Sequence, residues 1–202
     1  SWLTSALTSS LFAFLQRINL AYYLFPWIVQ SPAGIGFANL RQQNQFATLT
    51  SIGLVALFGF LVTSRRITRL HHWLAWSSLL VLSAGMACSS SRTGALEWIV
   101  INAIVFIFSW RQSNYLRKIL IRLSLSGPLF VFLWSIFIPW ISLQFNGAMG
   151  TSVLLRLANS TISNPDCGSR LVLWSNVLEL IAKRPVLGLS LIHISEPTRR
   201  YA

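Results

Sequence analysis

Five apolar stretches alternate with short polar segments along most of the chain. They cover residues 1–15, 41–64, 73–91, 95–110 and 123–145. A helix of about 20 mostly apolar residues crosses the hydrocarbon core of a bilayer, and the later four runs have or approach that length. The first run is shorter and is interpreted as part of a span. The pattern predicts an all-α, polytopic transmembrane helix bundle made from residues 1–145.

The second apolar stretch begins with an unusual group of polar residues. No ionisable side chain occurs from residue 46 to residue 62, yet one helix face would carry Arg41, Asn44, Gln45, Thr48 and Ser51. Polar side chains that enter a bilayer are costly, so they usually face a protein interior or a watery cavity and often mark a site. We interpret this stripe as functional. The alternative is a helix end whose long side chains reach back to the interface.

The last part of the chain predicts a loop, residues 146–189, with a helix of its own at 169–183. That helix is amphipathic, and Arg170 falls near the centre of its apolar arc. On a membrane surface, such an arginine would lie at the level of the lipid phosphates, or it would bend away to solvent. Both readings stay open from the sequence.

The charge pattern sets an orientation. The chain has 16 Lys and Arg against 4 Asp and Glu, and these basic residues gather between the apolar runs, which argues against nucleic acid as a partner. Three arginines lie in residues 65–72 and four basic residues in 111–122, so these loops are expected on the cytoplasmic side, near anionic lipids. Arg41, Arg92 and everything after residue 146 would then face outward.

Three other features carry weaker signals. Residues 22–27 contain Tyr, Phe and Trp, which favour the membrane interface, and an aromatic belt is a simpler explanation than a substrate platform. His71 and His72 have no acidic or cysteine companion nearby, so we expect interface anchoring rather than a metal site. Cys88 and Cys167 show no metal-ligand spacing, and the sequence cannot decide whether they form a disulfide.

Three motifs resemble one enzyme family. Residues 39–49 (NLRQQNQFATL) look like the signature of bacterial PglL-type O-oligosaccharyltransferases, and residues 91–94 (SRTG) resemble their outward Ser-Arg turn. Residues 167–181 (CGSRLVLWSNVLELI), followed by RPVLG, resemble the large periplasmic loop of that family. The turn is shared with the wider superfamily of O-antigen ligases (WaaL) and Wzy polymerases.

The resemblance implies a reaction and a place for it. A glycan would pass from undecaprenyl-pyrophosphate to a Ser or Thr of a protein such as pilin, at the periplasmic face of the bacterial inner membrane. In the O-antigen ligase branch the acceptor would be lipid A-core. The chemistry needs no nucleotide and, by resemblance, no metal, but it needs cations for the pyrophosphate. By motif position, Arg92 and Arg170 are the catalytic candidates. The substrate-binding candidates are Arg41, Asn44, Gln45 and Trp174.

The resemblance stops near the end of the chain. The family continues with Gly-Trp-Gly and a later His, thought to assist the acceptor hydroxyl, whereas residues 190–202 fit neither a span nor the family pattern. We expect these residues to be a non-native tail, so His193 does not inherit that role. The chain is therefore expected to be an inactive fragment of its parent enzyme. A transporter whose substrate path is lined by the 41–51 stripe is the remaining alternative.

Overall fold

The computed structural model describes residues 1–31, 35–64, 68–144, 174–179 and 181–182. The regular elements of the described residues are all helices, with no strand among them, which confirms the predicted all-α class. The elements are α1 (Trp2–Arg17), the 3-10 helix η1 (Leu20–Leu24), α2 (Gln43–Thr63), α3 (Arg69–Ser89), α4 (Arg92–Ser109) and α5 (Asn114–Gln144). All of them lie in one compact unit, Ser1–Leu157.

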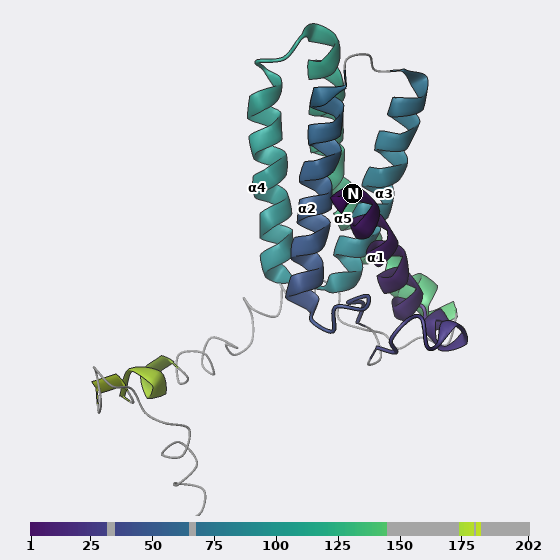
Figure 1. Ribbon diagram of the computed structural model, residues 1–202, viewed down its shortest axis with the longest axis vertical. Coiled ribbons are helices and arrows are strands. Elements are labelled where there is room, and N and C mark those ends of the chain that lie inside the picture. The colour runs from purple at the N-terminus through teal and green to yellow at the C-terminus, as the bar shows by residue number, and fades with distance from the viewer. Residues whose placement is uncertain (32–34, 65–67, 145–173, 180, 183–202) are drawn as a thin grey trace, which may run out of the picture. The chain divides into compact units, whose positions relative to one another are not determined.

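Helices α2 to α5 run side by side in alternating directions, and α1 crosses them obliquely (Figure 1). Because of this alternation, α2 and α4 begin at the end of the bundle where α3 and α5 finish. The last residues of α1 reach the same end, since the Ser142 hydroxyl of α5 donates a hydrogen bond of 3.2 Å to the Arg17 carbonyl oxygen. We call this the motif end, because residues 39–49 and 91–94 both lie there (Figure 1).

Three of the described helices are long and apolar enough to cross a membrane: Gln43–Thr63, Arg92–Ser109 and Asn114–Gln144. Their outer faces carry large exposed apolar side chains, such as Ile99, Ile107 and Phe137. A continuous apolar surface of this kind is typical of contact with lipid or with another protein. The chain is therefore a membrane protein, and the number of about five spans stays a prediction.

The oblique helix α1 packs closely because its neighbours present glycines. A Cβ atom added at Gly53 of α2 would lie 2.4 Å from the Cβ of Ala6, and one at Gly85 of α3 would lie 2.3 Å from the Ser10 hydroxyl oxygen. Small residues allow helix backbones to approach each other in membrane bundles. The bundle core then continues through a cluster of buried residues that includes Leu54, Leu79, Leu82, Trp98 and Leu120.

The helix boundaries differ from the sequence prediction by several residues, and two helix starts show why. Helix α5 begins at Asn114 rather than at residue 123, so Arg117, Lys118 and Arg122 belong to a helix and not to a loop. Lys and Arg are good helix formers, and a basic helix end is compatible with the interface. Helix α4 begins at Arg92 rather than at residue 95, because the Ser91 hydroxyl caps it by accepting a hydrogen bond from the Gly94 amide.

Candidate functional site

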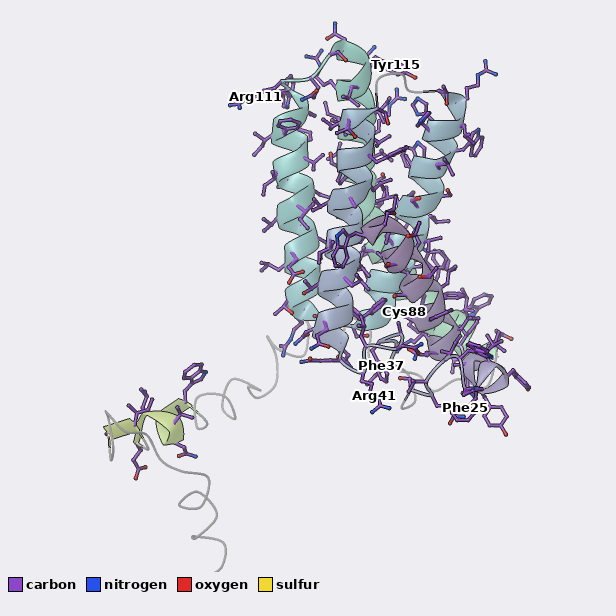
Figure 2. All side chains as sticks on the ribbon, in the orientation of Figure 1. Phe25, Phe37, Arg41, Cys88, Arg111 and Tyr115 are labelled. Atoms are coloured by element: carbon purple, nitrogen blue, oxygen red, sulfur yellow. The ribbon has the colours of Figure 1, made fainter. Side chains whose placement is uncertain are left out.

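Arg41 and Arg92 both lie at the motif end. Figure 2 shows Arg41 at the same end of the bundle as Phe37 and Cys88, with Arg111 and Tyr115 at the opposite end. Arg92 is the first residue of α4, which starts at the motif end. Both side chains are exposed. Two arginines that are 51 positions apart in the sequence (92 − 41) therefore share one end of the molecule.

Arg41 does not belong to the helical stripe that the sequence predicted. Its φ angle is 57°, in the left-handed region, and α2 begins only at Gln43. A left-handed backbone cannot continue a right-handed helix, so Arg41 leaves the face that Asn44 and Thr48 share. Such a φ costs an arginine roughly 1 kcal/mol, which makes Arg41 an outlier of the kind that gathers at binding sites.

Asn44 joins the two motifs. Its side-chain Oδ1 accepts hydrogen bonds from the Ser91 hydroxyl at 2.9 Å and from the Thr93 hydroxyl at 3.5 Å. The same Ser91 oxygen accepts the Gly94 amide at 3.2 Å and so begins α4. The start of α2 and the Arg92 turn are thereby held together through one carboxamide.

The rest of the polar stripe continues this contact between α2 and α4. The Thr48 hydroxyl donates to the Glu97 carboxylate at 3.3 Å, and the Trp98 indole N–H donates to the Thr50 hydroxyl at 3.2 Å. Glu97 lies in the second turn of α4, because that helix starts at Arg92. Ser51 is buried and donates to the Ala47 carbonyl at 3.1 Å. Residues 48–51 of α2 thus lie along a seam between α2 and α4. Helix packing accounts for these polar residues without a transport path.

Gln16 is a residue that the sequence reasoning missed. It is 6% exposed, and its Nε2 donates to the carbonyl oxygens of Val29 and Ala38, each at 2.7 Å. Its Oε1 accepts the Phe37 amide at 3.0 Å. One side chain therefore satisfies three backbone groups from two segments. No local pattern marks this role, because the partners are 13 to 22 positions away.

Asn39 and Gly36 complete the support of the motif loop. The Asn39 Oδ1 accepts the Val29 amide at 3.1 Å, and its Nδ2 donates to the Trp27 carbonyl at 3.0 Å. The Gly36 amide donates to the Cys88 carbonyl at 3.1 Å, and a Cβ at Gly36 would lie 2.6 Å from the Ala13 carbonyl oxygen. The backbone just before Arg41 is held on several sides.

The remaining predicted site residues are placed less fully. Gln45 is exposed in the first turn of α2. Trp174 is 64% exposed in the short described helix at 174–179. Arg170 and the rest of the first five residues of the predicted helix at 169–183 lie outside the described residues, as do residues 180 and 183. The roles of all three residues stay predictions.

The two histidines lie at the end opposite the motif end and have structural partners. The His71 Nδ1 lies 2.6 Å from the Thr68 hydroxyl at the start of α3, and its ring stacks on Phe60. The His72 Nε2 lies 2.8 Å from the Tyr115 hydroxyl and so connects α3 with α5. Both histidines belong to the first turn of α3 rather than to the preceding loop, because α3 begins at Arg69.

The motif segment itself matches a known family. Residues 37–61 match the family model described as protein glycosylation ligase. The resemblance to the PglL-type ligases is confirmed. The match begins in the loop held by Gln16 and extends along most of α2, so it includes Arg41, Asn44 and Gln45. No curated protein and no solved structure matches the chain.

The match covers a short part of the chain, and Arg92 lies beyond it. The structure nevertheless brings Arg92 to the matched segment through the hydrogen bond between Ser91 and Asn44. The candidate site therefore consists of the Arg41 loop, the first turn of α2 and the Arg92 turn.

Proposed function

We propose that this chain is part of a membrane enzyme that transfers a glycan from undecaprenyl-pyrophosphate to a Ser or Thr hydroxyl of a periplasmic protein such as pilin. The family match supports the general role of a protein glycosylation ligase. One observation carries the site: the Asn44 carboxamide holds the Ser91–Thr93 turn, so Arg92 belongs to the same end of the bundle as Arg41.

The reaction requires a stabilised leaving group. The acceptor oxygen forms a bond to the anomeric carbon of the glycan, while the bond from that carbon to the pyrophosphate oxygen breaks with its electron pair. The acceptor proton passes to a base. Stabilisation of the departing anion is usually a large term in such catalysis. Arginine suits this task because its planar fork binds phosphate oxygens at two points and stays ionised.

We assign Arg92 and Arg170 to the pyrophosphate and Arg41 to donor binding. The backbone supports the assignments of Arg92 and Arg41. Helices α2 and α4 both start at this end, and helix N-termini favour anions. Asn44 would orient the Arg92 turn, because its Oδ1 is engaged with Ser91 and Thr93. Gln45, exposed one residue further on, would contact donor or acceptor, as would Trp174.

The test uses the uninterrupted parent reading frame that contains these residues, expressed with a lipid-linked glycan and a pilin acceptor. We expect Arg92→Ala to lower pilin glycosylation by at least tenfold at unchanged protein level, with Arg92→Lys in between. Arg111→Ala, an exposed arginine at the opposite end of the bundle, is the matched control and should leave transfer unchanged. Full transfer by Arg92→Ala would refute the assignment.

A further inference from the structure

The loop after α1 presents four aromatic rings to the outside. Tyr22, Tyr23, Phe25 and Trp27 are 67%, 79%, 67% and 80% exposed. We call these four residues the aromatic foot. Figure 2 shows Phe25 at the motif end, the same end as Arg41. Exposed rings that lie together mark a surface made for a partner rather than for the protein's own core.

The aromatic foot projects from a backbone that is held in place. Ala21 and Ile28, on either side of it, are 3% and 1% exposed, so the base of the loop is part of the core. The Trp27 carbonyl accepts a hydrogen bond from Asn39, and the Val29 carbonyl accepts one from Gln16. The rings therefore stand outward because their backbone is fixed, not because the loop lacks contacts.

The chemistry of the surroundings identifies the partner. No charged residue occurs between positions 18 and 40. Tyr and Trp combine an apolar ring with a polar tip and prefer the boundary between lipid headgroups and acyl chains. The three helices that are apolar enough to cross a membrane begin or end at this level, and Trp140, near the end of α5, is 64% exposed.

We propose that the aromatic foot sits in the phospholipid headgroup layer and holds the Arg41 loop at that depth. The second part follows from the hydrogen bonds. The Asn39 side chain, two residues before Arg41, binds the backbone of both Trp27 and Val29. The Gln16 Nε2 donates to the carbonyl oxygens of Val29 and Ala38, and its Oε1 accepts the Phe37 amide. A change in the depth of the aromatic foot is therefore passed to the loop that carries Arg41. The partner is the membrane that surrounds the bundle, and a docked acceptor protein is the alternative outcome.

The first experiment measures the depth of the aromatic foot. The chain is placed in phosphatidylcholine–phosphatidylglycerol nanodiscs with a nitroxide label at Phe25→Cys, in a Cys167→Ser background in which Cys88 is buried. We expect collisions with oxygen, which dissolves in lipid, to exceed collisions with a water-soluble nickel chelate. A label that meets mainly the nickel chelate would overturn the proposal and favour a protein partner in water.

The second experiment measures the coupling to the Arg41 loop. A label at Leu40→Cys reports depth next to Arg41, and Phe25→Ser/Trp27→Ser should increase its collisions with the nickel chelate by about twofold or more. The matched control is Leu70→Ser/Trp73→Ser, which removes two exposed side chains from the opposite end and should leave the label unchanged. If the collision rate at Leu40→Cys is the same in Phe25→Ser/Trp27→Ser as in the control, and the protein is monodisperse, the aromatic foot does not set the depth of the Arg41 loop. Neither readout depends on glycan transfer.

Discussion

The carboxamide of Asn44 on α2 accepts a 2.9 Å hydrogen bond from Ser91, the residue that caps α4. We therefore propose that Asn44 is a positioning residue, which acts on the candidate chemistry through the turn that carries Arg92. The contact belongs to a seam that continues through Thr48 with Glu97 and through Thr50 with Trp98. These contacts hold α2 and α4 side by side, and the one at Asn44 lies next to Arg92.

Asn44→Ala should uncouple the Arg92 turn from α2. Loss of one such hydrogen bond within a membrane bundle costs about 0.5–2 kcal/mol, so the fold should survive. In the parent enzyme we expect glycan transfer to fall by about tenfold. The readouts are unfolding temperature in detergent and transfer to the acceptor.

The control for Asn44 is a double-mutant cycle with Ser91→Ala. If the two residues act through their contact, the double variant should lose no more transfer than the worse single variant. Fully additive losses would show that Asn44 acts by another route. Gln45→Ala, which changes the exposed neighbour of Asn44, separates a direct contact with substrate from the effect on the turn.

Gln16→Leu should destabilise the motif end. The variant keeps a similar size but leaves the Phe37 amide and two carbonyl oxygens without the partner that they have in this structure. Each buried backbone group left unsatisfied costs about 1–3 kcal/mol. We expect a lower unfolding temperature and faster hydrogen exchange at Phe37.

Gln16→Glu distinguishes a polar requirement from a specific one. A carboxylate can still accept the Phe37 amide, but it cannot donate to Val29 or Ala38 and would face their carbonyl oxygens. We expect it to be at least as destabilising as Gln16→Leu. Thr8→Ala, on the exposed face of α1, should have little effect, and equal losses in all three variants would remove the special role of Gln16.

Gly53→Ala should separate α1 from α2. The added methyl would lie 2.4 Å from the Ala6 Cβ, a distance that side chains do not tolerate. We expect a destabilisation of about 1–3 kcal/mol, as for other overpacked sites. Ala6→Gly/Gly53→Ala should recover part of the loss, because it removes the atom that clashes.

Gly59→Ala is the matched control for that prediction. It lies on the same helix, and nothing lies within 4 Å of its added Cβ. Alanine is a better helix former than glycine by about 1 kcal/mol, so this variant should be neutral or slightly more stable. A destabilisation equal to that of Gly53→Ala would contradict the packing account.

Arg41→Gly should separate stability from function. Glycine adopts the left-handed backbone of this position without the steric cost that arginine has, so the variant should be as stable as the parent protein or about 1 kcal/mol more stable. If the Arg41 guanidinium binds the donor, transfer should nevertheless fall by tenfold or more. Unchanged transfer would show that Arg41 does not bind the donor and only shapes the loop. Arg41→Lys tests whether the cation must be planar.

The sequence alone predicted the helices, and it predicted that the motifs of Arg41 and Arg92 lie at the same end of the bundle. Apolar runs of span length are a local property, and a residue's membership of such a run depends on its immediate neighbours. The exact starts of α4 and α5 could not be predicted from the lengths of the apolar runs. They depend on local hydrogen bonds: the Ser91 hydroxyl caps α4, and the Asn114 side chain accepts a bond from Arg117 in the first turn of α5. Arg41 lies outside α2 for a similar local reason, because its φ angle is in the left-handed region.

Tertiary structure decided which of these residues work together. The partner of Asn44 is 47 positions away, and those of Gln16 are up to 22 positions away. The close crossing of α1 depends on glycines opposite Ala6 and Ser10. A hydrogen bond or a close approach between helices is fixed by how their faces meet, and a sequence pattern records only the face. The sequence therefore determined that Arg41, Asn44 and Arg92 lie at one end of a membrane bundle, and the packing of α2 against α4 determined that Asn44 holds the turn of Arg92.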